Sequence, residues 1–589
     1  MKFSVFASYL EKLEKTSSRL LLISILAELF KEIHSPEEIQ KVCYLVQGRI
    51  APSFDALEIG MADKTIAVAI AQTYGSTKEA VLKEYAKKGD MGIVAEEFAQ
   101  KAKGKPAMAT TTVDEVFAVL THIAKTSGEG TVEKKLGLFS DLLQKVDSHS
   151  VRHVVRIPLG NLRLGIGDPT VLDALATAKL GDKSQRHYLE DAYNRTSDLG
   201  LIAYTLWKAK NPIHAVEEVA KLTVIVGHPI RSELCERLPS PEKTIEKMGT
   251  VDSQYKYDGF RVQIHKNGND ISLFSRNLEN MTHMFPELIE GAKRQIKAHS
   301  AILDSEALAY NPDSEEFYPF QETTKRRRKH NIAETMARLP LKAFVFDILY
   351  KNGKALINEP LTKRLEILKE TIESDGILFP AQTQTISDSK KLAFMLDDAI
   401  SKGLEGIVVK KLSSPYEAGA RNFNWVKLKR NQSGELKDTI DCVILGYVFG
   451  KGKRTAFGAG ALLVGIYDKK EDMFVTVSKI GTGLSDEEWK SIKKRTKGLE
   501  VDHKPARVSS VITPSVWVKP EIVIEVLADE ITRSPTHTAG AVLTDGKVVE
   551  PGYALRFPRL VSFRDTDKKA EDATDVKELI EMYKEQGKQ

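Results

Sequence analysis

The chain has 589 residues, of which 42% are hydrophobic and 28% are charged, which is typical of a soluble globular protein with about three or four domains. Its net charge of +5 permits a nucleic-acid partner without requiring one. Because Cys43, Cys235 and Cys442 lie far apart, a disulfide framework and a C-x-x-C zinc site are excluded, and a reducing, cytosolic compartment is favoured.

Residues 1–223 are predicted to form an almost wholly helical domain. Apolar residues recur there at three- and four-residue spacing, for example in 116–123. The apolar run at 20–30 is interrupted by polar residues and is too short for a membrane span, and we do not expect a signal peptide. Glycine and three prolines cluster in "GHPIRSELCERLPSPEK", residues 227–243, so a domain boundary is expected near residue 224.

Residues 224–431 are predicted to form an α+β domain built on antiparallel sheets. Several segments alternate apolar and polar residues, whereas two others have helical periodicity. The expected strands are 260–265, 271–276, 301–310, 342–350 and 405–411, and the expected helices are 285–297 and 387–402.

Residues 432–589 are predicted to form a small closed β-barrel with a C-terminal helix. Short strands with glycine and aspartate turns follow one another closely, as in "TIDCVILGYVFG", "GALLVGIYD", "MFVTVSKIG" and "EIVIEVLADE". The chain is therefore expected to be a multidomain protein with an all-α, an α+β and an all-β part in that order.

The stretch "SQYKYDGFRVQIH", residues 253–265, places Lys256 one step before a strong turn signal. Asp258-Gly259 favours a tight turn, and the alternation after it predicts a strand. Lys256 is thus expected at a strand–turn–strand junction, close to rigid backbone. A lone K-x-D-G is nevertheless more often a surface lysine before a hairpin, so the motif alone does not establish chemistry.

Standard nucleotide-binding motifs are absent from the sequence. No G-K pair stands in a Walker A context, and the protein-kinase catalytic loop is missing. The glycine-rich "GKGKRTAFGAG", residues 450–460, has the wrong spacing for a dinucleotide fingerprint. We expect it to let backbone and lysines approach a phosphodiester chain.

Charged residues recur inside segments that should be buried strands. Taken singly, each is best explained as the outward-facing residue of a half-exposed strand. Together they could supply a lysine nucleophile, carboxylates for a hard divalent metal and lysines for phosphates, and nearby cations would favour the neutral form of the nucleophile. The residues are Asp304, Glu306, Asp347, Glu405, Lys410, Lys411, Lys427 and Lys429.

An ordered series of motifs resembles the covalent nucleotidyltransferase superfamily. The series is K-Y-D-G (256–259), S-R-N (275–277), D-S-E (304–306), F-D-I-L-Y (346–350), E-G-I-V-V-K (405–410), W-V-K-L-K (425–429) and R-F-P-R (556–559). Within that superfamily, essentially the whole chain resembles ATP-dependent DNA ligases of the archaeal and eukaryotic replicative type. The further motifs "RIPLGNLRLGIGD", "YNRTSDLGLIA", "KIGTGLSDEEW" and "EVLADEITRSP" contribute to the resemblance.

The resemblance implies three domains and a set of residue roles. Residues 1–223 would bind DNA, 224–431 would be the adenylylation (nucleotidyltransferase) domain, and 432–589 would be an OB-fold domain. Lys256 would form the bond to AMP, with Glu306 and Glu405 as metal ligands. The implied nucleotide-binding residues are Gln254, Arg261, Arg276, Glu306, Phe346, Lys427, Lys429 and Arg556.

The resemblance also implies cofactors and partners. ATP would donate AMP, with Mg²⁺ as the metal and Mn²⁺ as a substitute, and nicked double-stranded DNA would be the substrate. We expect a monomer in the cytoplasm, associated with the nucleoid and not with a membrane. RNA ligases and RNA-capping nucleotidyltransferases share the same core and are the alternative enzyme class, but the helical domain at 1–223 favours duplex DNA. A non-catalytic scaffold is disfavoured by the intact lysines.

Two positions depart from the family pattern. Gln254 stands where the family usually has a glutamate that reads the adenine amino group, and an amide can both accept and donate. Some archaeal members bind the sliding clamp through an aromatic pair, but the comparable residues here, 103–112, contain no aromatic residue.

The basic run "KRRRK", residues 325–329, is interpreted as a solvated loop or a phosphate contact.

Overall fold

The computed structural model describes most of the 589 residues and groups them into two compact units. Unit 1 comprises 1–234, 259–380 and 413–421, and unit 2 comprises 235–258, 381–412 and 422–589. The residues not described are 103–109, 311–316, 319, 328–330, 375, 403, 430–437, 450–458, 482–483, 485, 529, 535, 545, 557, 565–566 and 586–589.

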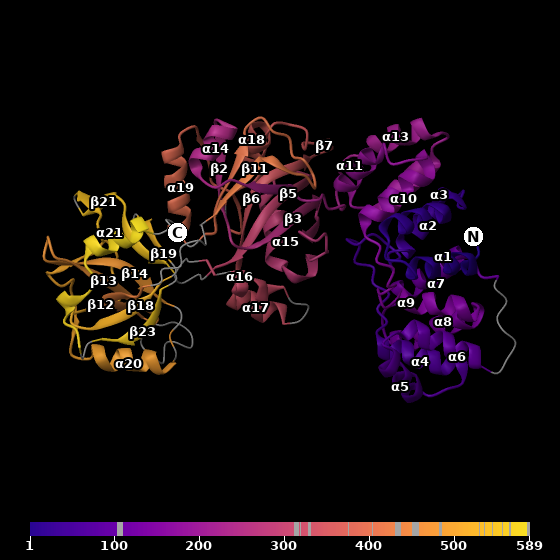
Figure 1. The fold of residues 1–589 in the computed structure, drawn as a ribbon, viewed down its shortest axis with the longest axis horizontal. Helices are drawn as coiled ribbons and strands as arrows, with labels where there is room; N and C mark the ends of the chain where they lie inside the picture. Colours follow the sequence, from indigo (N-terminus) through magenta and orange to yellow (C-terminus); the bar gives the residue numbers. More distant parts are fainter. Residues whose placement is uncertain are drawn as a thin grey trace. The chain divides into compact units, whose positions relative to one another are not determined.

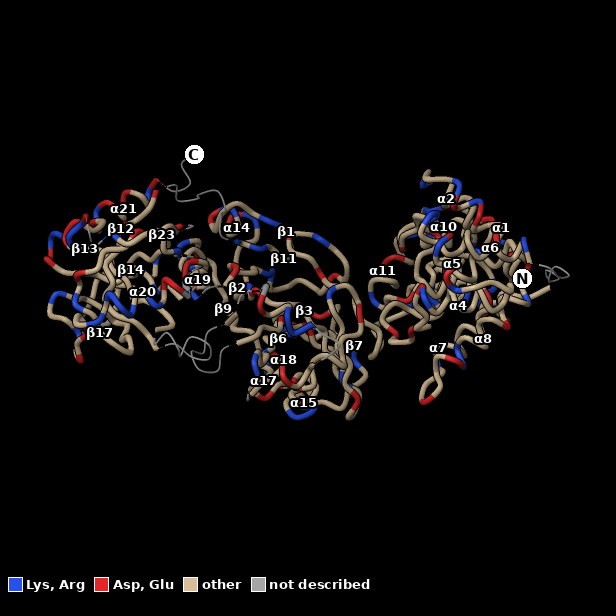
Figure 2. The backbone as a smooth tube through the Cα atoms, turned by 90° about the horizontal axis from the view of Figure 1, so that it is seen from below, with Lys and Arg blue, Asp and Glu red and all other residues tan. Residues whose placement is uncertain are grey.

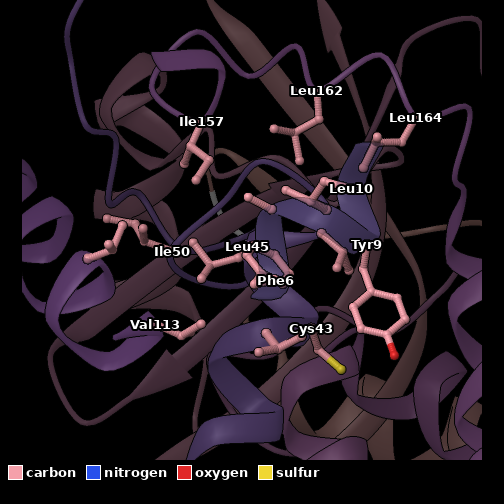
Figure 3. Close-up of a cluster of buried hydrophobic side chains, with 14 of the residues drawn as sticks. Phe6, Tyr9, Leu10, Cys43, Leu45, Ile50, Val113, Ile157, Leu162 and Leu164 are labelled. Atoms are coloured by element: carbon pink, nitrogen blue, oxygen red, sulfur yellow. The ribbon is translucent and has the colours of Figure 1, made fainter. Parts of the chain in front are cut away.

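The first part of unit 1 is helical, as the sequence predicts (Figure 1). Its described helices are α1 (Phe3–Glu14), α2 (Arg19–Lys31), α3 (Pro36–Leu45), α4 (Asp63–Tyr74), α5 (Lys78–Lys88), α6 (Met91–Lys101), α7 (Val113–Lys125), α8 (Thr131–Lys145), α9 (Ser148–Arg156), α10 (Asp168–Leu180), α11 (Arg186–Thr196), α12 (Leu199–Lys208) and α13 (Pro212–Ala220). Their apolar faces share one large core. In Figure 3, Phe6 and Leu10 of α1 lie in the same buried cluster as Cys43 and Leu45 of α3.

Hydrogen bonds hold the segment after α13 against the second part of unit 1. Gln263 pairs with the backbone of Ile230, accepting from its N–H at 2.7 Å and donating to its carbonyl at 3.1 Å. The N–H of Gly227 donates to Nδ1 of His265 at 2.9 Å, and Ser197 Oγ donates to the carbonyl of Pro229 at 2.5 Å. The motif that contains Ser197 therefore anchors this connection.

The second part of unit 1 is built on a six-stranded sheet of order β4-β3-β5-β6-β7, with β8 paired to β6. Its central strands are antiparallel, and alternate residues of β3 and β5 enter an apolar core. The strands are β3 (Phe260–Asn267), β4 (Asp270–Ser275), β5 (Ser300–Ala309), β6 (Leu341–Lys351), β7 (Lys354–Ala355) and β8 (Leu378–Pro380), and the α-helices are α15 (Pro286–Gln295), α16 (Phe320–Thr323), α17 (Ile332–Arg338) and α18 (Leu361–Thr371).

Unit 2 begins with a five-stranded sheet of order β1-β11-β10-β2-β9. Helix α19 packs against β2, β9 and β10, as well as against α14. The strands are β1 (Leu234–Arg237), β2 (Val251–Lys256), β9 (Thr383–Ile386), β10 (Gly406–Lys411) and β11 (Arg421–Lys429), and the helices are α14 (Pro241–Met248) and α19 (Ser389–Ser401). The expected strand at 405–411 and the expected helix at 387–402 are thus confirmed.

The last part of unit 2 is a β domain, in agreement with the predicted all-β region. Its main sheet has eight strands, with β12 (Ile440–Val448), β13 (Ala461–Asp468) and β14 (Met473–Ile480) at its centre. Pairing of β12 with β18 (Val523–Leu527), and of β18 with β23 (Arg559–Phe563), extends the sheet. The remaining described elements are α20 (Asp486–Thr496), β15 (Glu500–Val501), β16 (Val508–Ser509), β17 (Val516–Val518), β19 (Glu530–Ser534), β20 (Val542–Thr544), β21 (Lys547–Glu550), β22 (Gly552–Arg556) and α21 (Val576–Glu585).

Within the described part of the chain, no helix is both long enough and apolar enough to cross a membrane. The glycine-rich segment at 450–460 falls largely outside the described residues. So does the stretch 103–112, where some archaeal ligases carry an aromatic pair. The same holds for the end of the basic run at 325–329, whereas Arg326 is buried and pairs with Glu287.

Among the histidines that the structure describes, three are buried and neutral. Burial is the main reason why the pKa values of His153, His265 and His537 are lowered to about 3. Because the folded-state pKa lies below the unfolded value of about 6.5, the unfolded chain gains protons first as the pH falls. Each histidine therefore costs stability progressively between about pH 6.5 and pH 3.

We predict that replacing His153 with Leu weakens the loss of stability on acidification. At pH 5 an unprotonated buried histidine costs about 2 kcal/mol of unfolding free energy relative to neutral pH. Calorimetric melting of the whole chain at pH 7.5 and pH 5 should show a smaller downward shift for His153→Leu than for the native protein. His34→Gln is the control, because His34 is exposed. An unchanged shift in His153→Leu would contradict the prediction.

Candidate active site

The antiparallel register of β2, β10 and β11 places four of the expected site residues in two cross-strand rows. Gly406 of β10 lies opposite Lys256 on one side and Lys429 on the other. Val408 lies in the same way between Gln254 and Lys427. Because side chains alternate with period two, both rows are on the same face of the sheet. Figure 2 colours the lysines of β11 blue.

Gly406 is required at the centre of the first row. Its φ is +143°, a conformation that side-chain-bearing residues rarely adopt. A Cβ atom at this position would also lie 2.2 Å from the carbonyl oxygen of Leu428. Glycine therefore allows β10 and β11 to approach closely at the row that contains Lys256 and Lys429.

Glu405 joins the two lysines of this row. Lys256 Nζ donates to Glu405 Oε2, and Lys429 Nζ forms an ion pair with Glu405 Oε1. The backbone N–H of Glu405 also donates to the carbonyl oxygen of Lys256 at 3.1 Å. The three side chains are 24% (Lys256), 26% (Glu405) and 34% (Lys429) exposed, so the cluster is accessible to a ligand. Burial, followed by the charge of Lys256, lowers the pKa of Lys429.

Gln254 is the buried member of the second row. Gln254 is only 2% exposed, and its side-chain Nε2 has no hydrogen-bond partner among the described residues. A buried amide donor without a partner is costly, at about 1–3 kcal/mol. The position therefore suits a ligand that offers an acceptor.

Arg261 lies on the six-stranded sheet of unit 1, where Asp304 and Tyr416 hold its guanidinium. Arg261 Nε donates to Asp304 Oδ1 at 2.9 Å, and NH1 donates to the carbonyl oxygen of Glu233 at 3.0 Å. Tyr416 Oη accepts from Arg261 NH2 at 3.2 Å and donates to Asp304 Oδ2 at 2.8 Å. Although burial opposes it, the charge of Asp304 raises the pKa of Arg261.

Phe346 occupies a β-bulge in β6. Asp347 pairs with Asp304, and the next pair is Val345 with Ser305, so Phe346 is the extra residue between them. Its ring centroid is 5.2 Å from the guanidinium carbon of Arg261. Glu306 of β5 lies opposite Arg261 of β3 in the same sheet.

Asp304 and Asp347, two of the charges that interrupt apolar strands, are fully buried and each is neutralised by an arginine. Asp347 accepts from Arg364 Nε at 2.7 Å and from its NH2 at 3.0 Å, and both residues are 0% exposed. These pairs correct the expectation that such residues face outward from half-exposed strands. Their burial is balanced within the protein and requires no metal ion.

Arg276 is exposed directly after the end of β4. A tight turn follows, in which the N–H of Ser275 donates to the carbonyl of Glu279 at 2.9 Å. Leu278 has a φ of 66°, which is strained for a leucine and fixes the course of this turn. Arg276 is thus carried on a defined backbone.

Arg556 ends β22 in the C-terminal β domain. Its Nε donates to Thr532 Oγ1 at 2.7 Å, and Glu530 is its partner in the ladder with β19. Glu306, in unit 1, and Glu405, in unit 2, are the two expected metal ligands. Among the described residues, no group of three or more His, Cys, Asp or Glu side chains could hold a metal ion.

Sequence reasoning missed Tyr416 and Glu233, which support Arg261, and the pair Asp398–Lys402, which contacts Tyr255. The contacts made to Arg261 and to Tyr255 join residues far apart in the chain. The i,i+4 spacing of Asp398 and Lys402 can be recognised in the sequence, but it does not indicate their contact with Tyr255.

Comparisons with known proteins define the class of this chain as DNA ligase. Residues 2–176 match the family described as "DNA ligase N terminus", 232–429 match "ATP dependent DNA ligase domain", and 455–568 match "ATP dependent DNA ligase C terminal region". A "Probable DNA ligase" of Dictyoglomus turgidum is 45% identical over 589 residues, covering 100% of this chain and 98% of the relative.

Two further relatives that are similar over the whole chain are also named as DNA ligases. "DNA ligase 2" of Thermofilum pendens is 40% identical over 601 residues, covering 100% of this chain and 98% of the relative. The "DNA ligase" of Nitrosopumilus maritimus is 38% identical over 591 residues, covering 100% and 99%. The chain belongs to the ATP-dependent DNA ligase family and is an enzyme, which confirms the resemblance seen in the sequence.

Proposed function

We propose that this enzyme seals nicks in duplex DNA with ATP, and that Lys256 carries AMP as a covalent intermediate. The observation that carries the proposal is the cross-strand row in which Lys256 and Lys429 flank Gly406 and share the carboxylate of Glu405. This row fixes an amine beside a second cation in a half-buried, accessible place. The match of residues 2–176 to a DNA ligase N terminus favours DNA over the RNA-ligase and capping alternatives.

Three displacements at phosphorus make up the proposed reaction. Lys256 Nζ loses a proton and attacks the α-phosphorus of ATP, which forms a P–N bond and expels pyrophosphate. The 5′-phosphate oxygen at the nick then attacks the same phosphorus, so AMP leaves the lysine. Finally the 3′-hydroxyl loses a proton and attacks the 5′-phosphate, which forms the phosphodiester and releases AMP.

Mg²⁺, or Mn²⁺ in its place, fits the oxygen donors that this chain offers. Glu405 is half-buried beside the nucleophile, and we propose Glu405 and Glu306 as ligands of the ion. When bound, the ion would neutralise negative charge on the phosphates. Lys427 and Lys429 add two positive charges on the same face of the sheet, to grip the α-phosphate.

The remaining residues would hold the nucleotide and the DNA end. Gln254 offers its unpartnered Nε2 to the base, and Phe346 offers an aromatic face for stacking. Arg261 and Glu306 share one row of the sheet and would contact the ribose. Exposed Arg276 would bind the ribose, the phosphates or the 5′-phosphate of the nick.

We propose that the N-terminal helices bind the duplex and that the C-terminal β domain is an OB-fold barrel that closes over the nucleotide. Phosphate contacts would supply most of the affinity for DNA. We further propose a monomer in the cytoplasm, associated with the nucleoid. A sliding-clamp contact through an aromatic pair at 103–112 finds no support, since that stretch contains no aromatic residue.

Replacing Lys256 should abolish the covalent protein–AMP adduct. Ala removes the nucleophile, and Arg carries a guanidinium that stays protonated at any working pH. The measurement is transfer of label from α-labelled ATP to the protein, followed by sealing of a nicked duplex. Lys243→Ala is the control, because Lys243 pairs with Glu246 on the surface. An adduct of native yield in either Lys256 variant would assign the nucleophile to another residue.

Gln254→Glu should sharpen the preference for ATP over GTP. A carboxylate only accepts hydrogen bonds, so it favours the amino group of adenine and repels O6 of guanine, whereas the amide of Gln254 can donate to that oxygen. The ratio of adduct formation rates with ATP and GTP measures the effect. An equal ratio in the two proteins would remove Gln254 from base recognition.

Arg556→Ala should slow self-adenylylation by about 100-fold or more, yet largely retain sealing of a nick that is supplied already adenylylated. A guanidinium can stabilise the charge of departing pyrophosphate, a leaving group that occurs only in the first displacement. Single-turnover kinetics on both substrates measure the difference. Arg507→Ala is the control, because Arg507 pairs with Asp472 and Glu571 elsewhere on the same domain. Equal losses on both substrates would show a general structural role.

A further inference from the structure

Lys256 stands between two tyrosines whose hydroxyl groups have different partners. Tyr255 belongs to β2 and alternates with Gln254 and Lys256, so its side chain lies on the opposite face of the sheet. Tyr257 is deeply buried, and its hydroxyl oxygen accepts a hydrogen bond from the backbone of Gln382. The two rings meet edge to face, with their centroids 6.4 Å apart.

The hydroxyl of Tyr255 is bound to the C-terminal turn of α19. It donates to Asp398 Oδ2 and accepts from Lys402 Nζ at 2.8 Å. Lys402 Nζ also donates to Asp398 Oδ2 at 2.7 Å, and it lies 4.7 Å from the centroid of the Tyr255 ring. The three side chains therefore form a closed hydrogen-bonded triangle that joins α19 to β2.

This triangle adjoins the segment that carries Glu405. The N–H of Leu404 donates to the carbonyl of Ala399 at 3.0 Å, which continues the end of α19. The N–H of the next residue, Glu405, donates to the carbonyl of Lys256 at 3.1 Å. Lys402 and Glu405 are thus each bound to the strand that carries Lys256, the first through the Tyr255 hydroxyl and the second through its backbone N–H.

We propose that Tyr255 is a positioning residue for formation of the protein–AMP adduct: its hydroxyl fixes the end of α19 and thereby the place of the Glu405 carboxylate beside Lys256. The inference rests on the proposed roles of Lys256 and Glu405. Burial, and then the hydrogen bond to Asp398, raise the pKa of Tyr255, so the hydroxyl keeps the proton that it donates.

Tyr255→Phe tests the role, because it removes only the hydroxyl and keeps the ring over Lys402. We expect the rate of protein–AMP formation at saturating ATP to fall about tenfold, as for loss of a hydrogen bond to a charged group. The Mg²⁺ concentration for half-maximal rate should rise, since a displaced Glu405 would bind the ion less well. Tyr257→Phe is the matched control, and it should leave the Mg²⁺ dependence unchanged.

A double-variant cycle separates positioning from a general loss of stability. In a Glu405→Gln background, Tyr255→Phe should add little further loss, because both changes act through the same carboxylate. Asp398→Asn keeps an oxygen acceptor for the tyrosine and should lose less activity than Asp398→Ala. Melting temperatures of all variants show whether each protein is folded.

Three outcomes would overturn the inference: equal losses in Tyr255→Phe and Tyr257→Phe, full additivity with Glu405→Gln, or a Tyr255→Phe enzyme that matches the native one. If Tyr255→Phe does not fold, the comparison of Asp398→Asn with Asp398→Ala still decides, and equal activity in those two variants would overturn the inference. A native protein that forms no adduct with ATP would instead refute the proposed function itself.

Discussion

The register between β2, β10 and β11 is the constraint on which the candidate site depends. It places Gly406 opposite both Lys256 and Lys429, and a slip of one residue would turn every one of these side chains to the other face. That register requires glycine at position 406, because a Cβ atom there would clash with the carbonyl oxygen of Leu428. The site geometry is therefore set first by the backbone ladder and only then by contacts between side chains.

Charged residues in apolar strands have two different uses in this enzyme. Asp304 and Asp347 are fully buried and locked to Arg261 and Arg364, and breaking such a pair costs about 3–5 kcal/mol because an unpaired charge stays buried. The cluster at Glu405 remains about a quarter exposed, so its partners can be exchanged for a ligand. The buried pairs support the sheet, whereas the Glu405 cluster is the one for which we propose a chemical role. Exposure and the identity of the partner separate them, and neither can be obtained from strand patterning.

Most of the architecture could be predicted from the sequence, since period-two alternation marked β3, β5, β6 and β10, and the helical spacing marked the N-terminal region. The order of the motifs also gave the family. The bulge at Phe346 and the support of Arg261 by Tyr416 could not be predicted, because each depends on pairing between distant segments. For the same reason, no pattern indicated that one boundary between the two compact units lies beside Gly259.

The charges at Lys256 explain why the nucleotide and the cation should bind together in the proposed reaction. Two lysines around one carboxylate leave a single positive charge in a half-buried place, and every charge has a partner before ligand arrives. A phosphate that takes Lys429 leaves Glu405 with Lys256 as its one cation, and Lys256 cannot stay in that ion pair if it is to attack. Glu405 would hold a divalent ion that accompanies the phosphate, and this would restore the charge balance at the carboxylate. Lys256 would then be free of its ion pair, and the amine must lose that pairing and its proton before it can attack.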